Sequence, residues 1–257
     1  MNPSEPELTS DLFVVLGVAN DQRFEIVFQM ASYLIFHGES VELWHHESEA
    51  LPDCPALAQL LNKGMQTSTW SLETESCAFA KAPIARPGVT ALFLAHGTLH
   101  LVDMLETLAY WVPSSGFALQ RITTWVDCYK VSQCSRTRKW YECCFHFSDL
   151  VILDEFKSLP VSWLKEYKAF FKRESYPCII ENTRKGRLHD MLLVMDNQVR
   201  RIAQVFEKPD ELVFALNDEE EDDDEEDELP DLSQPQNEPY FERLIDGRRS
   251  KLVPDPE

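Results

Sequence analysis

The turn after the first apolar run has the spacing of a phosphate-binding loop but lacks its chemistry. It reads GVANDQRF, begins at Gly17, and lies between a buried strand at residues 12–16 and a helix at 24–33. Phosphate-binding loops follow the pattern G-x-x-x-x-G-K-[ST]: backbone amides wrap the phosphates, the lysine reaches the outer phosphates, and the hydroxyl binds Mg²⁺. Here Gln22 and Arg23 replace the second glycine and the lysine, and a phenylalanine replaces the hydroxyl residue. Because phenylalanine cannot bind magnesium, a nucleotide hydrolase with this turn would lack its catalytic groups.

The residues of this turn also have a second interpretation. Any α/β protein can carry a glycine after a strand, so the turn alone is equally typical of an ordinary strand-to-helix connection. The guanidinium of Arg23 suits phosphate oxygens, which would allow binding without hydrolysis. A solvated arginine at the start of a helix is the alternative. Asn20, Asp21 and Phe24 complete the candidate nucleotide-binding residues of the turn.

The composition favours one sizeable, moderately acidic domain with appendages. The chain has 257 residues, of which 44% are hydrophobic, an ordinary share for a globular protein. Residues 218–228 are acidic at all eleven positions, which leaves −9 of the formal net charge of −20 for the rest of the chain. This balance argues against binding to nucleic acid or to an anionic membrane surface, because both require cationic patches.

Targeting signals and cysteine content predict a cytoplasmic protein. No stretch of about 18 uninterrupted apolar residues is present, so no transmembrane helix is expected, and the acidic N-terminus resembles no secretory signal. The seven cysteines form no regular framework of a secreted domain, which favours free thiols. Cys128, Cys134, Cys143 and Cys144 match no zinc-ribbon spacing, and we interpret them as small apolar packing residues.

Strand-like and helical segments alternate along the chain, which predicts βαβ units and a mostly parallel sheet. Residues 64–88 are expected to be irregular. The expected strands are residues 12–16, 40–44, 89–94, 122–127, 150–154 and 178–182. The expected helices are residues 24–33, 53–63, 99–111, 133–146, 161–173 and 187–206.

The same pattern sets the expected organisation of the chain. A flexible N-terminus at residues 1–10 precedes the α/β domain at 11–216. An acidic, proline-containing linker at 217–239 follows, and we expect it to be disordered because it can bury too little apolar surface. A short motif at 240–257 ends the chain, and it either docks a partner or folds back onto the domain.

Polar residues follow the expected strands, at the edge where parallel sheets bind ligands. They are Gly17, Glu47, His96, Asp127, Asp154 and Asn182. His45 and Glu47 would share one face of a strand as a weak metal-site candidate, with His46 on the other face. A polar loop rim is the alternative. No Ser/His/Asp or Cys/His set has a spacing that indicates a nucleophile and its base.

Several segments, taken in order, resemble one protein family. The most specific is YPCIIENTRKGRLHDMLL, residues 176–193, in which a proline precedes a strand and a glycine opens a helix. The chain resembles the CobW-type metallochaperone GTPases, which group with the hydrogenase and urease maturation GTPases, in unbroken order over residues 11–195. The other matching segments are VELWHHE (41–47), LFLAHGTLHLVDMLETL (92–108, which keeps Gly97), ITTWVDCYKV (122–131) and FSDLVILDEFKSL (147–159).

The resemblance implies a three-layer P-loop NTPase-like α/β fold with helices on both faces of a mostly parallel sheet. It implies GTP and Mg²⁺ as ligands if the altered loop still binds them, but the departures lie at the chemistry. The Asn-Lys-x-Asp motif reads DEFK from Asp154 to Lys157, and lysine offers no acceptor to guanine. The Glu-x-Ser-Gly turn reads LAHG at residues 94–97 and has lost its carboxylate. The Cys-x-Cys-Cys metal motif keeps one thiol, Cys77, too few ligands for a zinc or other transition-metal site.

Three functional hypotheses follow. The leading one is a CobW-like domain that has lost GTP hydrolysis and acts as a binding or regulatory module for a protein partner, through the acidic tail or residues 240–257. The second is an active GTP-dependent metal chaperone in which Arg23 replaces the lysine. The third is an acidic partner-binding or nucleic-acid-mimicking protein whose active part is the acidic run at 218–228. We expect neither a nucleic acid nor a membrane as a partner.

Overall fold

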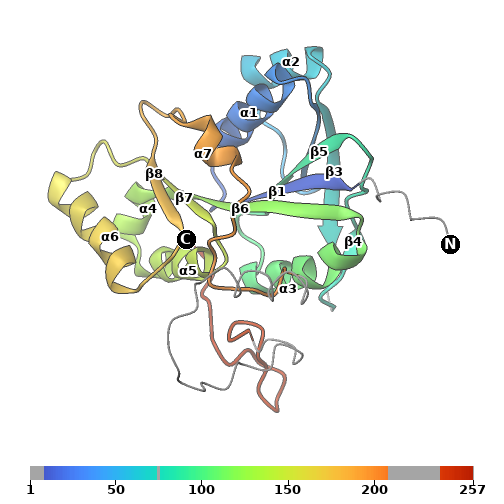
Figure 1. Cartoon of the computed structure of the whole chain (residues 1–257). Helices are drawn as coiled ribbons and strands as arrows, with labels where there is room; N and C mark the ends of the chain where they lie inside the picture. Colours follow the sequence, from blue (N-terminus) through green and yellow to red (C-terminus); the bar gives the residue numbers. More distant parts are fainter. Residues whose placement is uncertain (1–8, 74–75, 208–237, 257) are drawn as a thin grey trace, which may run out of the picture.

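A mostly parallel sheet of eight strands forms the centre of the protein (Figure 1). The structure is a computed structural model that describes residues 9–73, 76–207 and 238–256. Its strands are β1 (Ser10–Leu16), β2 (Ser40–His46), β3 (Gln66–Leu72), β4 (Phe79–Lys81), β5 (Val89–Leu94), β6 (Phe117–Asp127), β7 (Leu150–Asp154) and β8 (Ile179–Asn182). They lie side by side in the order β4-β3-β2-β5-β1-β6-β7-β8, and all neighbours are parallel except β3 and β4.

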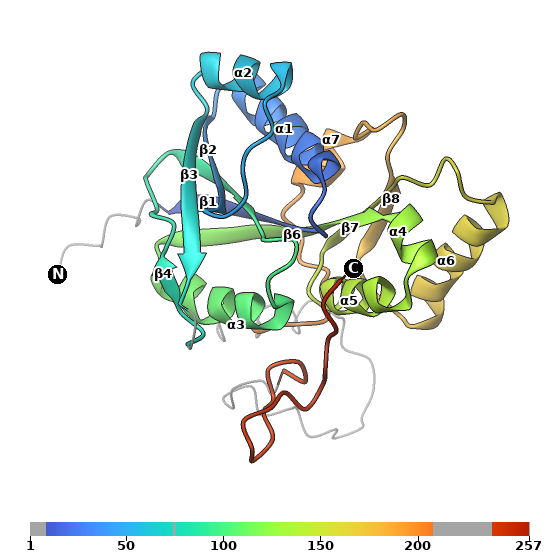
Figure 2. The ribbon, with the colours of Figure 1, turned by 180° about the vertical axis from the view of Figure 1, so that it is seen from behind.

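Helices cover both faces of this sheet. They are α1 (Asp21–Phe36), α2 (Pro55–Asn62), α3 (Leu101–Trp111), α4 (Cys128–Gln133), α5 (Ser135–His146), α6 (Val161–Arg173) and α7 (Met191–Met195), with a 3-10 turn at Val112–Ser114. α1, α2 and α7 lie on one face, and α3 and α5 lie on the other (Figures 1 and 2). The predicted architecture is therefore confirmed: a three-layer, mostly parallel α/β fold with helices on both faces of the sheet and its first strand among the inner strands.

The central strands form from apolar runs that are buried on both faces. β1, β5 and β7 bury nearly all of their side chains, as expected for parallel strands that carry a helical layer on each side. Because β1 pairs with β5 on one side and β6 on the other, the turns that follow these three strands meet at the same edge. That edge holds most of the polar residues singled out in the sequence.

The segment expected to be irregular, residues 64–88, contains two strands, so that prediction was wrong. β3 pairs in parallel with β2, from Glu42 opposite Gln66 to His46 opposite Trp70, and β4 adds to it in the antiparallel direction. Within β3 only the side chains at positions 70 and 71 are buried. It therefore shows no apolar alternation, and main-chain pairing with β2 defines it instead.

The helix expected over residues 187–206 is also wrong, because only α7 is helical there. The buried guanidinium of Arg121 takes backbone carbonyls in and after α7, including that of Asp196 (2.6 Å), which a longer helix would need for its own amides. Farther on, the carboxylate of Asp149 accepts the amide of Arg200 (2.8 Å). Tertiary hydrogen bonds thus override the local helical propensity.

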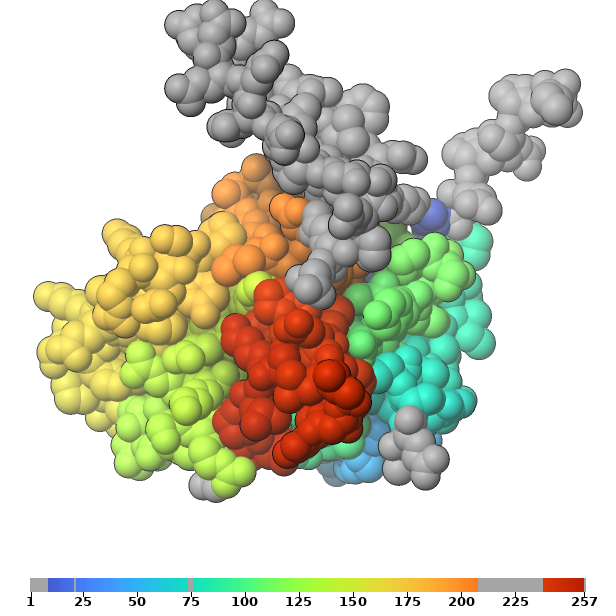
Figure 3. All heavy atoms as spheres, turned by 90° about the horizontal axis from the view of Figure 1, so that it is seen from below, coloured from blue at the N-terminus to red at the C-terminus, as the bar shows by residue number. Residues whose placement is uncertain are grey.

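The C-terminal residues 238–256 fold back and lie across α3 and α5 (Figure 3), which is one of the two outcomes expected for the terminal motif. The flexible N-terminus expected at 1–10 and the disordered linker expected at 217–239 fall almost wholly outside the described residues. Among the residues that are described, no helix combines the length and the apolar character needed to cross a membrane.

Candidate functional site

The turn from β1 to α1 is closed against neighbouring segments. The amide of Val18 donates to the hydroxyl of Tyr141 (3.4 Å), and the amide of Ala19 donates to the carbonyl of Gly97 (3.3 Å). A Cβ atom placed on Gly97 would lie 2.0 Å from the nitrogen of Ala19, so only glycine permits this approach. In a phosphate-binding loop such amides point at the ligand, whereas protein acceptors hold them here.

The N-terminus of α1 is capped from within the protein. Asn20, the N-cap residue, accepts the amide of Gln22 through its side-chain oxygen (2.9 Å) and the amide of Arg23 through its carbonyl (3.3 Å). Its side-chain nitrogen donates to Asp127 (3.2 Å), the last residue of β6. The helix terminus that would otherwise attract a phosphate therefore faces an asparagine and a buried carboxylate.

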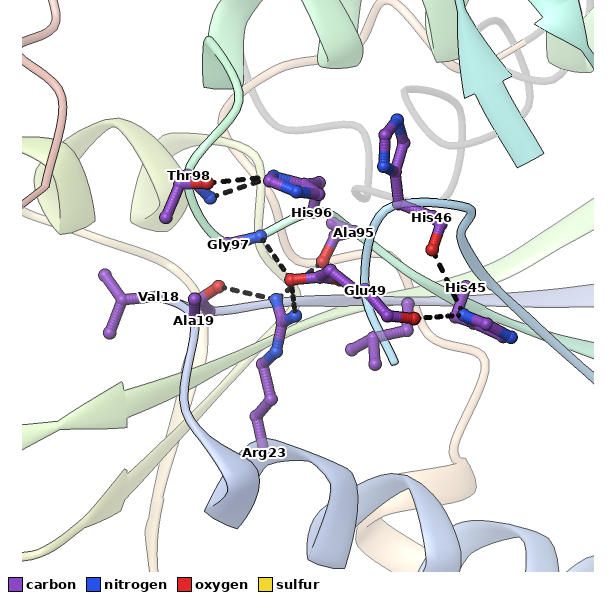
Figure 4. A network of polar contacts seen from close by, with 12 residues as sticks. Val18, Ala19, Arg23, His45, His46, Glu49, Ala95, His96, Gly97 and Thr98 are labelled. Atoms are coloured by element: carbon purple, nitrogen blue, oxygen red, sulfur yellow. Dashed lines mark hydrogen bonds and ion pairs between the residues drawn. The ribbon is translucent and has the colours of Figure 1, made fainter. Parts of the chain in front are cut away.

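Arg23 is buried beneath the turn (Figure 4). Its guanidinium donates to the carbonyls of Gly17 (3.1 Å) and Ala95 (2.7 Å) and forms an ion pair with Glu49. Only 1% of the arginine side chain and 12% of the glutamate side chain are exposed, so a carboxylate already neutralises the cation. The interpretation as a solvated arginine is wrong, and the guanidinium meets protein acceptors where the other interpretation places a phosphate.

The other predicted loop and base-recognition residues form no visible ligand cradle. Phe24, at the position of the magnesium-binding hydroxyl, is buried in the core and packs against Phe28. Gln22 and Lys157 are exposed. Asp21 begins α1, and its side chain lies outside the described part of the protein. Among Phe24, Gln22 and Lys157, whose side chains the structure describes, none makes a contact that marks a nucleotide site.

The sheet edge beyond β6 and β7 is acidic. The buried carboxylate of Asp154 accepts a hydrogen bond from Trp125 (3.3 Å), and a second one from Thr183. Asp127 lies opposite Asp154 in the register of the two strands. Burial, and then these two carboxylates, raise the pKa of Glu155 above its ordinary value. An anionic ligand would meet repulsion here without a bound cation.

The solved structures that resemble the chain include two GTPase structures. The zinc-bound YjiA GTPase from E. coli is 10% identical to it, with a TM-score of 0.49, over 74% of this chain and 61% of that chain. A zinc-bound triple mutant of the YjiA GTPase gives a TM-score of 0.45 at the same identity and coverage. This chain spans about three fifths of the length of these proteins. No protein-family model matches the chain, and neither does any curated protein.

Two histidines and a serine form a hydrogen-bonded series at the ends of β2 and β5. Nδ1 of His96 accepts the amides of Thr98 (3.1 Å) and Leu99 (2.8 Å), so its proton is on Nε2. Nε2 lies 3.2 Å from the hydroxyl of Ser48, which lies 2.8 Å from Nδ1 of His46. The amide of Ser48 also donates to that Nδ1, which makes it an acceptor. The hydrogen bonds therefore run in one direction, from His96 through Ser48 to His46.

The predicted metal pair of His45 and Glu47 receives no support from the geometry. Nδ1 of His45 contacts the carbonyls of His46 (3.1 Å) and Glu49 (2.9 Å), so this nitrogen carries the proton and is not a metal ligand (Figure 4). Glu47 follows β2 and is exposed. In the part of the chain that the structure describes, neither residue belongs to a group of three potential ligands.

Cys77 does lie in such a group, together with Asp103 and Glu106 of α3, with ligand atoms within 4.8 Å of one another. The thiol donates to Glu106 (2.8 Å), and burial together with this bond raises the pKa of Cys77 to about 11. Arg243 and Arg249 from the C-terminal segment also bond to Glu106 (3.0 and 2.5 Å). A protonated thiol and two guanidinium cations do not fit a transition metal, which requires a thiolate.

A pocket of about 560 Å³ lies beside this group at the carboxyl ends of β2 and β3. Five of its eleven lining residues are acidic or histidine, and Arg243 contributes a cation from the C-terminal segment. They are His46, Glu47, Glu73, His100, Asp103 and Arg243. Because ligands of α/β sheets bind at this edge, the pocket is well placed for a ligand, and the C-terminal segment forms part of its wall.

We expect the histidine series to make the protein less stable in acid. Burial lowers the pKa of His96 and of His46 below the ordinary value of 6.5. Near pH 6.5 the unfolded chain therefore binds protons that the folded chain does not bind. The free energy of unfolding consequently falls as the pH drops below that value. Urea unfolding at about pH 7.5 and about pH 5 measures this difference.

Replacement of His96 by glutamine, which keeps an acceptor for the two amides, should reduce the fall in the free energy of unfolding between about pH 7.5 and about pH 5. The control is the exposed His189→Gln, which should leave the difference between the two pH values unchanged. An identical pH dependence of the wild-type chain and His96→Gln would contradict the assignment.

Sequence reasoning missed the residues that close the site, above all Glu49, Ser48 and Tyr141. One signal was available for Arg23, the partner of Glu49. It lies four residues before Val27 and therefore on the apolar stripe of the helix, where an arginine is buried only with an acidic partner. Nothing in the sequence indicates that this partner is Glu49 and not the nearby Glu47.

Proposed function

We propose that the protein is a CobW-like domain that no longer hydrolyses GTP and acts as a binding or regulatory module. The observation that carries this proposal is the closed turn at residues 17–24, whose amides and arginine contact the protein itself. The order of weak sequence matches over residues 11–195 supports the CobW-like origin. The α/β scaffold is intact, whereas internal contacts occupy the groups that would bind phosphate. This combination is consistent with a role in binding.

The missing groups account for most of the rate of phosphoryl transfer in P-loop enzymes. That reaction depends on positioning and on charge neutralisation by Mg²⁺ and the loop lysine. Here Phe24 is in the core and the guanidinium of Arg23 is neutralised by Glu49. The buried carboxylates of Asp127 and Asp154 add negative charge along the same edge. A nucleotide would have to displace several internal hydrogen bonds and would gain no catalytic group.

The two alternative hypotheses have less support. An active metal chaperone would need Arg23 to face phosphate and Cys77 to be a thiolate, and both groups are held by carboxylates. The hypothesis that the acidic run at 218–228 is the active part concerns residues outside the described structure. A protein partner that binds this run stays a proposal, compatible with the module proposed here.

Titration with fluorescent GTP and ATP analogues, with and without Mg²⁺, tests the proposal. We expect no binding at about 1 mM nucleotide, an affinity weaker than about −4 kcal/mol. Binding in the micromolar range that requires Mg²⁺ and is lost in Arg23→Ala would overturn the proposal and favour the metal chaperone. Weak binding that is unchanged in Arg23→Ala and indifferent to Mg²⁺ would agree with a closed turn.

A further inference from the structure

The C-terminal segment, residues 238–256, binds to the domain through side chains. Its backbone hydrogen bonds close within the segment, for example from the amide of Leu244 to the carbonyl of Arg248 (2.7 Å) and from Ser250 to Glu242 (3.0 Å). Within the described residues, no backbone-to-backbone bond joins it to the sheet or to a helix. The segment is therefore a turn, closed by its own backbone bonds, that lies on the surface of the domain (Figure 3).

Two arginines anchor one end of the segment to α3. Arg249 is 7% exposed and bonds to both Asp103 and Glu106 (2.5 Å each). Arg243 reaches the same Glu106 (3.0 Å) from the other limb of the turn. Burial alone would raise the pKa of Glu106, but the bonds from Arg249 and Cys77 hold it below its ordinary value. The surface thus presents a buried carboxylate that fits a guanidinium.

Aromatic side chains anchor the other end to α5. Phe241 stacks on Phe147, with ring centroids 5.5 Å apart and planes at 17°, and Tyr240 is buried against the same ring. Glu238 bonds to the imidazole of His146 (3.0 Å) at the end of α5. The segment therefore resembles a peptide motif, an aromatic pair followed by two spaced arginines, and each part contacts side chains of the domain that complement it.

A neighbouring irregular segment, residues 201–203, is attached to the domain by main-chain hydrogen bonds. The amides of Ile202 and Ala203 both donate to the carbonyl of His146 (3.1 Å each), and Arg201 pairs with the buried Asp149 (2.6 Å). Main-chain bonds hold that segment in place, whereas the C-terminal segment lacks them. The difference indicates a ligand-like attachment.

We propose that residues 238–256 are an exchangeable peptide ligand of their own domain, bound in cis. Thirty residues, 208–237, join the two parts of the chain, and a covalent link of this length gives an effective concentration on the order of 1 mM. A segment that binds in the micromolar range on its own would then be bound nearly all the time. A partner displaces it only by presenting the same aromatic and arginine chemistry.

The surface that is uncovered when residues 238–256 are displaced would be the binding surface of the proposed module. In this respect the inference rests on the proposed function. Arg243 also lines the pocket beside His46 and His100, so release of the segment would open one wall of that pocket. Nucleotide titration and peptide exchange are separate measurements. A failure of one leaves the other interpretable.

Binding of a labelled synthetic peptide of residues 238–256 to the full chain tests the proposal. The wild-type chain should bind it weakly because its own segment competes, whereas Arg249→Ala should bind at least about tenfold more tightly because its own segment is weakened. The control is Arg248→Ala, since Arg248 is exposed and, among the residues that the structure describes, its side chain pairs only with Asp246 of its own turn. It should behave as wild type. Equal affinity of the wild-type and Arg249→Ala chains would overturn the proposal.

A second experiment serves if Arg249→Ala fails to fold. A protease site placed in residues 229–237 of the full chain allows the segment to be cut from the domain after folding. We expect the folded domain to exchange its cut segment for the labelled peptide within minutes. A domain that unfolds on cutting, or that keeps its segment for days in excess peptide, would show an integral part of the fold. A stable swapped dimer of the uncut chain would overturn the assignment in cis.

Discussion

Replacement of Arg23 by methionine is expected to lower the free energy of unfolding by about 3–5 kcal/mol. Methionine keeps the apolar stem but leaves Glu49, 12% exposed, without its cation. It also leaves the carbonyls of Gly17 and Ala95 without a donor, and a buried acceptor without a partner costs about 1–3 kcal/mol. Urea unfolding, followed by tryptophan fluorescence, measures the loss.

The double variant Arg23→Met with Glu49→Gln isolates the ion pair. Because the two side chains touch, the losses should not add, and the double variant should be more stable than the sum of the single ones predicts. The control is Arg173→Met, whose pair with Glu174 is exposed on both sides and should change stability by no more than about 1 kcal/mol. If Arg23 were a phosphate ligand, its loss would spare stability and remove nucleotide binding. That result would contradict the structural role.

This role explains a cation at this position of the turn without any need for a bound phosphate. The lysine of an active loop extends toward the ligand, whereas Arg23 bends under the turn and joins β1, β5 and the segment after β2. A planar guanidinium with five donors can bond three acceptors at once, which an ammonium on a flexible stem does less well. Position 23 is therefore structural, because its guanidinium links the ends of β1 and β5 to the segment after β2.

The sequence identified the elements whose apolar pattern is set by burial. The runs at 12–16, 89–94 and 150–154 are central strands because parallel strands covered on both faces must be apolar throughout. The amphipathic residues 161–173 are helical over the predicted range. Prediction from the sequence failed where hydrogen bonds, and not burial, define the element. β3 is a strand because it pairs with β2, and α7 ends where Arg121 donates to its backbone carbonyls.

The candidate site shows the same division. Position along the strands placed Gly17, His96 and Asp127 at one edge, and the structure brings the turns that hold them into contact. Which groups bond there depends on contacts between segments far apart in the sequence, such as Val18 with Tyr141. A pattern of residue types cannot reveal them, because a glutamate that pairs with a buried arginine and one that faces solvent look alike in a sequence.

Replacement of Gly97 by alanine should open the turn that we regard as closed, at a cost of about 3 kcal/mol, the upper end of overpacking losses. The added Cβ would lie 2.0 Å from the nitrogen of Ala19, 2.5 Å from its Cα and 2.7 Å from the carbonyl carbon of Val18. All three are backbone atoms, so no side chain can rotate away. The bond from the amide of Ala19 to the carbonyl of Gly97 has to break.

Urea unfolding measures the cost, and hydrogen exchange at Ala19 reports whether the turn has moved. The control is Gly64→Ala, at a position with φ of +96° and no atom within 4 Å, where strain alone should cost about 1–2 kcal/mol. Equal losses in the two variants would mean that the turn is not clamped against Gly97. If Gly97→Ala stays folded and still binds no nucleotide, closure is not the sole barrier. The lost magnesium ligand and the neutralised Arg23 would then be sufficient to exclude it.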